Sequence, residues 1–139
     1  MKAQFTTKLR MEWVDDELPY DDGSRPWRVF EPLRFYSAEL KRLVQAPAGL
    51  RTDLYSIPFF GRVFYPQSEA GNPASVIHDA AYQLQLQDKD GMPLRVTKDE
   101  ADALLREGMR ACGVNSARAW LFWKAVRVFG QGEFQKAVV

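Results

Sequence analysis

The segment Asn72-Pro73-Ala-Ser-Val-Ile-His78-Asp79-Ala-Ala-Tyr82 organises the chain, and it holds the only histidine of the sequence. Asparagine is a favourable N-cap residue, and proline fits the first helical position, where its missing N–H costs nothing. We therefore expect a helix from about Pro73 to Gln87. The spacing of four residues puts His78 and Tyr82 on one face, while Asp79 lies about 100° around the helix from His78. The helix can thus offer an imidazole and a carboxylate side by side.

The composition is that of an ordinary globular protein. The 139 residues are 46% hydrophobic and 27% charged, and we expect one domain over residues 1–139. With 19 basic and 18 acidic residues and no run of Lys or Arg, we expect no nucleic-acid partner. Cys112 is the only cysteine, which excludes a disulfide framework within the chain and argues against a structural zinc site. We also expect neither a signal peptide nor a transmembrane segment, since no apolar run is long enough.

Residues 1–66 have the pattern of a β-rich part. We expect a first strand over residues 5–13 and a second over residues 27–35, because apolar residues recur there at roughly every second position. Residues 43–50 indicate a strand end and a turn. An aromatic loop, residues 59–66, follows. Prolines keep these strands short or place them at sheet edges, at positions 26, 32, 47, 58 and 66.

Residues 72–130 have the pattern of a helical part that carries the candidate site. After the first helix, Thr97 and Glu100 form a capping box that opens a second helix. Its apolar stripe follows the 3.6-residue period, and Asp102 lies at the edge of that stripe or within it.

A third helix is expected from Ser116, as its N-cap, to Gly130. Its wide apolar face is more typical of a core than of a membrane-facing or partner-facing patch, and comprises Ala119, Trp120, Phe122, Trp123, Val126 and Phe129. Together the two parts predict an α+β fold, with an N-terminal antiparallel β part packed against two or three C-terminal α-helices.

We interpret His78, Asp102 and Tyr82 as a candidate catalytic group. A short loop joins the first two helices, so they should pack antiparallel, and Asp102 can then meet His78 across the gap. A histidine works as a general base when something orients its other ring nitrogen, and a carboxylate from a facing helix does so. The alternative is a core histidine bonded to a backbone carbonyl, with Asp102 at the solvent edge.

Asp79 is a candidate metal ligand, because hard cations such as Ca²⁺ take oxygen ligands. One carboxylate does not make a calcium site, so the other ligands would be backbone carbonyls of residues 59–64. The alternative is an aspartate on the helix surface.

Four motifs occur in the order found in the family catalogued as domain of unknown function 1353. They are Gly49-Leu-Arg-Thr-Asp53-Leu-Tyr-Ser56-Ile-Pro58, His78-Asp79-Ala-Ala-Tyr82, Glu100-Ala-Asp102 with Met109 and Gly113, and Ala125-Val-Arg127-Val-Phe-Gly130. The chain resembles this family from about residue 5 to residue 134. The family is found mostly in tailed bacteriophages and prophages, so the resemblance implies a phage origin and no particular function.

His-Asp-x-x-Tyr on one helix and Ala-Asp on the next also resemble the phospholipase A2 site, especially its compact form in parvovirus capsid proteins. The resemblance implies that His78 activates a water molecule, Asp79 binds Ca²⁺, and Asp102, supported by Tyr82, orients His78. That family places a glycine-rich calcium loop before the histidine, whereas residues 59–62 here hold one glycine.

From these resemblances we expect a phage-encoded, phospholipase A2-like hydrolase, with a His/Asp dyad that activates water and Ca²⁺ as the candidate cofactor. The alternative is a non-catalytic bacteriophage structural or tail-assembly protein that keeps the helix pair as a scaffold. The partner would be a phospholipid or membrane surface in the first case and other phage virion proteins in the second. Either function would place the protein in the host cytoplasm or the phage virion.

Overall fold

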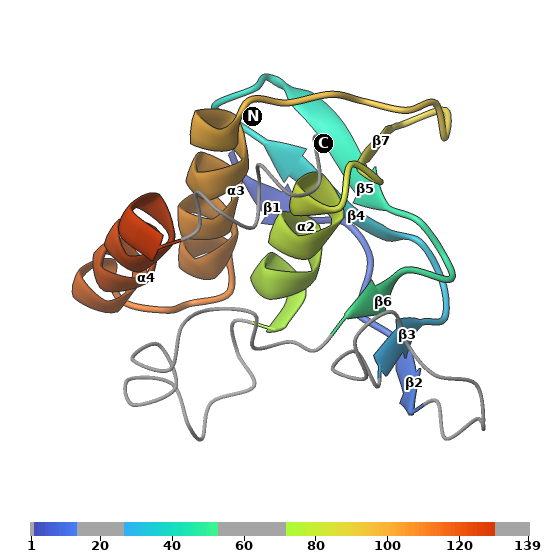
Figure 1. Ribbon diagram of the computed structural model, residues 1–139, viewed down its shortest axis with the longest axis horizontal. Helices are drawn as coiled ribbons and strands as arrows, with labels where there is room; N and C mark the ends of the chain where they lie inside the picture. The colour runs from blue at the N-terminus through green and yellow to red at the C-terminus, as the bar shows by residue number, and fades with distance from the viewer. Residues whose placement is uncertain (1, 14–26, 53–71, 130–139) are drawn as a thin grey trace.

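Two small antiparallel sheets form the N-terminal part of the structure (Figure 1). The computed structural model describes residues 2–13, 27–52 and 72–129. One sheet has the strand order β1-β4-β5-β7, and the other has the order β2-β3-β6. The strands are β1 (Gln4–Phe5), β2 (Met11–Trp13), β3 (Trp27–Val29), β4 (Leu33–Ser37), β5 (Arg42–Ala46), β6 (Arg51–Thr52) and β7 (Gln87–Asp88).

The chain changes sheets within each of its first three extended segments, which contain β1 and β2, β3 and β4, and β5 and β6. We expected one strand over residues 5–13 and one over residues 27–35, and both expectations were wrong, because each segment is split in two. Pro32 lies in the bend between β3 and β4, where its missing N–H and fixed φ end the ladder of β3. Beside the bend, Phe30 N donates to the Arg10 carbonyl at 2.8 Å. The neighbouring segments therefore stay paired while they change direction together.

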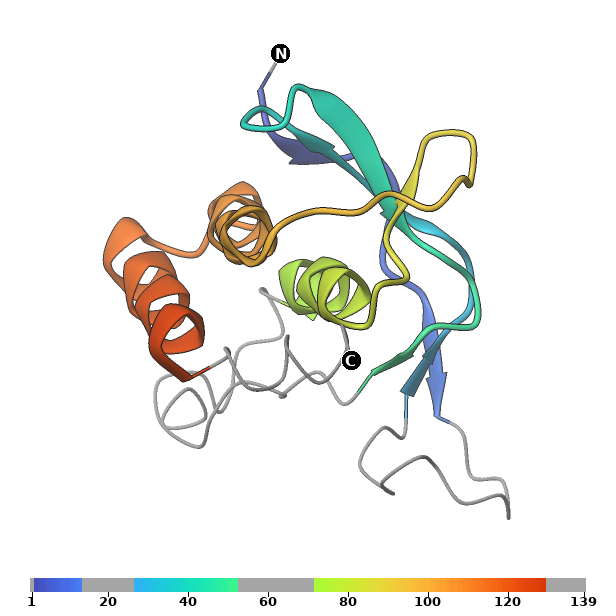
Figure 2. The same ribbon diagram turned by 45° about the horizontal axis from the view of Figure 1, so that its top comes forward.

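Within the described residues, three helices pack with these sheets: α2 (Asn72–Tyr82), α3 (Lys98–Ala111) and α4 (Ser116–Phe129). The α+β class predicted from the sequence is confirmed. Figure 2 shows α2 along the curved strands, α3 beside α2, and α4 on the far side of α3. Among the described residues, none of these helices has the length and apolar character that crossing a membrane requires.

Helix α2 ends five residues earlier than the sequence pattern predicted. Leu84 has a φ of 59°, and Gln85 N donates to the Ala80 carbonyl at 2.8 Å, which is the hydrogen bond of a Schellman ending. The chain then turns outward, and Gln87 pairs with Gln45 as part of strand β7. The part expected to be helical therefore contributes one edge strand to the first sheet.

The predicted capping box of α3 is confirmed. Thr97 accepts from Glu100 N at 3.1 Å, and the Glu100 carboxylate accepts from Thr97 N at 2.9 Å. Helix α4 begins differently from the expectation, because Asn115 accepts from Arg118 N at 2.9 Å and so takes the N-cap place assigned to Ser116.

The apolar face of α4 is narrower than expected. Phe122 and Val126 are buried, but Trp120 is 44% exposed and Trp123 is half-buried. The predicted end of the helix at Gly130 lies outside the described residues.

The core forms where the helices meet each other and the sheets. Phe5 packs against two buried clusters, one between the sheets, α2 and α3, and the other between α2, α3 and α4. Ala74 near the start of α2 faces Gly108 near the end of α3, so the two helices run antiparallel. A Cβ placed on Gly108 would lie 2.9 Å from the Ala74 Cβ and 3.2 Å from its Cα. Glycine thus lets the two backbones approach closely.

Gly108→Ala should destabilise the protein. Alanine favours a helix over glycine by about 1 kcal/mol, but the added methyl group meets an atom fixed to the backbone of α2. We expect a net loss of about 1–3 kcal/mol, typical of overpacking, measured by urea unfolding. Ala74→Gly combined with Gly108→Ala should recover part of that loss, because it removes the nearest contact. Equal or higher stability of Gly108→Ala alone would contradict the close packing.

Candidate functional site

The carboxylate of Asp102 on α3 is fully buried and gathers side chains from three helices. His78 Nε2 lies 3.1 Å from Asp102 Oδ1, and the Tyr82 hydroxyl donates to the same oxygen at 2.5 Å. Lys98 Nζ donates to Oδ2 at 2.6 Å, and Arg127 Nη1 lies 3.8 Å from that oxygen. The predicted meeting of His78, Tyr82 and Asp102 across antiparallel helices is confirmed as geometry. Their roles in catalysis stay a prediction.

Local sequence explains how α2 presents its two rings. His78 and Tyr82 are four residues apart, and their ring centroids lie 4.1 Å apart on one helix face. The alternative of Asp102 at the solvent edge was wrong, because this residue has no exposed surface. His78 is itself only 4% exposed, and its imidazole faces a carboxylate through Nε2.

The charge on Asp102 determines which nitrogen of a neutral His78 ring carries the hydrogen. Burial alone would raise the pKa of this carboxyl, but hydrogen bonds from His78, Lys98 and Tyr82 outweigh burial and hold the pKa below its usual value. The carboxylate is therefore ionised at neutral pH and only accepts hydrogen bonds. A neutral His78 then carries its hydrogen on Nε2 and keeps the lone pair on Nδ1.

Tyr82 remains a donor to the same carboxylate. Its burial and its hydrogen bond to Asp102 raise the pKa of the Tyr82 phenol well above its usual value. The phenol therefore keeps its proton over the whole range in which the protein could work, and the bond to Oδ1 is maintained.

Asp79 lies next to this group in sequence and makes a different contact. It is 6% exposed and accepts a hydrogen bond from the Thr52 hydroxyl on β6, so the alternative of a surface aspartate was wrong. Among the residues that the structure describes, no group of three or more His, Cys, Asp or Glu side chains could hold a metal ion. One carboxylate and one hydroxyl fall short of the six to eight oxygens that Ca²⁺ takes. The expected calcium loop, residues 59–64, lies outside the described residues.

Sequence reasoning missed three partners of the site. Lys98 is four residues before Asp102, and side chains at this spacing lie on one helix face. The sequence alone could therefore have predicted this pair. Thr52 is 27 residues from Asp79 and Arg127 is 25 residues from Asp102 along the chain, so only the tertiary fold brings these pairs together.

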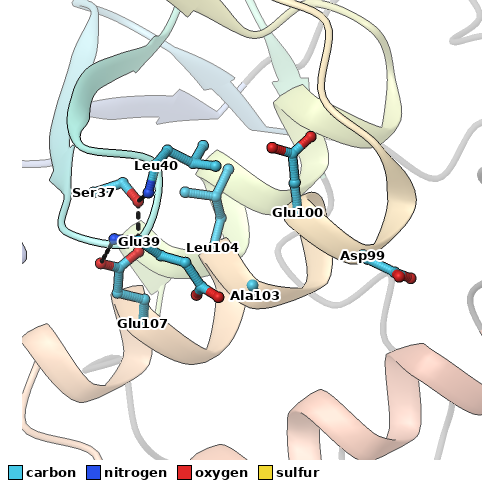
Figure 3. Close-up of a pocket in the computed structure, with 8 residues that line it drawn as sticks. All are labelled: Ser37, Glu39, Leu40, Asp99, Glu100, Ala103, Leu104 and Glu107. Atoms are coloured by element: carbon cyan, nitrogen blue, oxygen red, sulfur yellow. Dashed lines mark hydrogen bonds between the residues drawn. The ribbon is translucent and has the colours of Figure 1, made fainter.

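A pocket of about 260 Å³ lies on another face of α3 (Figure 3). None of the candidate catalytic residues lines it. Two of its acidic side chains already serve the fold, because Glu107 accepts from Ser37 Oγ at 2.7 Å and Ala38 N at 2.6 Å, while Glu100 belongs to the capping box of α3. The pocket is lined by Ser37, Glu39, Leu40, Asp99, Glu100, Ala103, Leu104 and Glu107.

Asp102→Asn should lower stability in a pH-dependent way. Because the folded pKa of Asp102 lies below its unfolded value of about 4, its stabilising effect is complete above that value and disappears as the pH falls through the folded pKa. At about pH 7 we expect the variant to lose roughly 3 kcal/mol, since Lys98 loses its buried partner. The gap to wild type should narrow at about pH 3. Urea unfolding at both pH values measures the difference in unfolding free energy between the variant and wild type.

The exposed Asp90 offers a matched control. Asp90→Asn removes the same charge from the turn after β7, and it should change stability by no more than about 0.5 kcal/mol at either pH. A loss in Asp102→Asn that stays constant between the two pH values would show that the ionised form of Asp102 contributes nothing.

Comparison with known proteins gives one match. No curated protein and no solved structure matches the chain. The family described as protein of unknown function (DUF1353) matches residues 27–126, a range that includes His78, Asp79, Tyr82 and Asp102. The chain therefore belongs to the DUF1353 family.

Proposed function

We propose that this protein is a phage-encoded hydrolase that cleaves phospholipid esters in the manner of phospholipase A2. One observation carries the proposal: His78 Nε2 lies 3.1 Å from an oxygen of the fully buried Asp102, and Tyr82 holds the same oxygen. An imidazole oriented in this way on one nitrogen can act as a base with the other.

The reaction follows from that orientation. A water molecule bound at Nδ1 of His78 gives its proton to the ring as its oxygen attacks the ester carbonyl. The ionised Asp102 stabilises the imidazolium that forms, because the two charges are in contact within a buried site. The ring then returns the proton to the leaving alcohol when the carbon–oxygen bond of the ester breaks. Tyr82 keeps Asp102 in place throughout.

Calcium is a separate part of the proposal. Bound at Asp79, the ion would supply positive charge near the carbonyl oxygen of the substrate. The described donors make only part of such a site, so no step above depends on it.

The second candidate function is a structural or tail-assembly role in a phage particle. The burial of His78, which is 4% exposed, favours it. In that role, the hydrogen bonds from α2 and α3 to Asp102 would only lock the helices together, and no substrate would reach the ring.

His78→Gln separates the two functions. Glutamine keeps a donor for Asp102 but takes up no proton at neutral pH, so we expect fatty-acid release from mixed phospholipid vesicles to fall roughly 10²–10⁴-fold. Stability should change by about 1 kcal/mol or less, since one hydrogen bond is retained in weaker form.

Tyr82→Phe is the matched comparison, because it leaves the imidazole intact and removes only one donor to Asp102. Its rate should fall far less, by roughly tenfold, which corresponds to about one lost hydrogen bond. A wild type that is inert on every phospholipid class, with His78→Gln destabilised, would support the scaffold function and reject the hydrolase.

Calcium binding can be tested without an activity assay. A site with Asp79 as its only carboxylate should bind Ca²⁺ weakly, at roughly 0.1–1 mM. About 10 mM Ca²⁺ should then raise the melting temperature of wild type, because the ion binds the folded state, and leave Asp79→Asn unchanged. Equal melting curves for the two proteins with and without Ca²⁺ would remove calcium from the proposal.

A further inference from the structure

Lys98 connects the buried carboxylate to the third helix. It is the first residue of α3, and its side chain is only 12% exposed. Its Nζ donates to Asp102 Oδ2 at 2.6 Å and to the Val126 carbonyl of α4 at 3.1 Å. A lysine at a helix start would normally extend its charge into water. Here two fixed acceptors on two helices hold the ammonium group inside the structure.

We propose that Lys98 is a positioning residue for the His78–Asp102 pair, fixing the carboxylate through Oδ2 so that Oδ1 stays directed at His78 Nε2. The expected loss of hydrolysis rate without Lys98 rests on the function proposed above, whereas the expected change in the tautomer of His78 does not.

The two oxygens of Asp102 have separate partners. Oδ1 receives the two groups from α2, His78 and Tyr82, whereas Oδ2 receives cations from α3 and α4. The last side-chain torsion of aspartate is broad and roughly two-fold, so the carboxylate rotates easily unless both oxygens are held. Lys98 supplies the short contact on Oδ2.

Arg127 takes a lesser part in holding Oδ2. It is 3.8 Å from that oxygen, its side chain is 34% exposed, and its main partner is Asp99. Removing Lys98 would therefore leave Oδ2 without a close donor among the described residues. The neutral ring of His78 would then lose its fixed acceptor, and both of its tautomers would become populated.

The alternative is a role for Lys98 that is only structural. Val126 is in the last turn of α4, where carbonyls lack partners within the helix and a nearby cation is favourable. A lysine that only satisfied this carbonyl would affect stability and leave the ring of His78 unchanged. The experiment therefore needs a measurement on the ring itself.

The single histidine makes that measurement direct, because the ring ¹⁵N signals of the whole protein come from His78 alone. Once the ring is neutral, which is reached by raising the pH until its signals stop changing, wild type should show one tautomer with hydrogen on Nε2 and a bare Nδ1. Lys98→Met should show averaged signals from both tautomers. Lys98→Arg keeps a cation and several donors, and it should restore the wild-type spectrum.

Kinetics on phospholipid vesicles give the second readout. We expect Lys98→Met to lose about 10–100-fold in kcat, the usual cost of misplacing a catalytic group, with KM changed by less than about threefold. Lys98→Arg should recover most of that loss. Lys124→Met removes the same charge from an exposed position of α4, and it should match wild type in spectrum and rate.

Each outcome decides one part of the proposal. A single wild-type tautomer in folded Lys98→Met overturns the positioning role, whatever the rate. If Lys98→Met and Lys98→Arg lose stability to the same extent and the ring signals of His78 do not change, Lys98 only caps α4. That result also overturns the positioning role. A wild type without hydrolysis rejects the proposed function, while the ring signals still test Lys98. If Lys98→Met does not fold, Lys98→Leu replaces it with the same expected spectrum, because a leucine side chain has no donor to hold Oδ2.

Discussion

The ionised carboxylate of Asp102 is the constraint on which the arrangement of the helices depends. Burying an unpaired carboxylate costs several kcal/mol even after relaxation, so this residue at 0% exposure requires its donors to be in place. His78 and Tyr82 come from α2, Lys98 from α3 itself, and Arg127 from α4. No helix can shift far without leaving part of the charge unsatisfied. One side chain therefore fixes three helices to one another.

The interface between α2 and α3 uses different chemistry at its two ends. Near the start of α2, Ala74 and Gly108 bring the backbones close, and apolar packing holds them. Near the end of α2, the polar contacts of His78 and Tyr82 with Asp102 hold the two helices together. The next residue along the chain, Asp79, turns to the other side and accepts from Thr52 on β6. Consecutive residues of α2 thus attach the helix to α3 and to the second sheet, which fixes the rotation of the helix about its axis and the direction of the imidazole.

The sequence predicted best the features that depend on short spacings. The α+β class, the capping box at Thr97 and the pairing of His78 with Asp102 follow from helix periodicity and from a short connection between two helices. Strand breaks were missed because alternation of apolar residues continues through the bend at Pro32, where the chain changes sheets. The end of α2 was missed because Leu84 adopts a positive φ that usually belongs to glycine. Thr52 could not be predicted, since its contact with Asp79 exists only after the sheets and helices have packed together.

The cost of the buried charge bears on the choice between an enzyme and a scaffold. Replacing a buried ionic group by well-packed apolar residues is often neutral or stabilising by about 1–4 kcal/mol. Helices that only had to be held together would gain as much from the packing already present at Ala74 and Gly108. The group around Asp102 holds the three helices, but it also supplies what apolar packing cannot, namely a fixed charge against Nε2 of the one histidine and a defined lone pair on Nδ1. A base needs that property and a scaffold does not, which is an argument for the hydrolase proposed above rather than for the structural role.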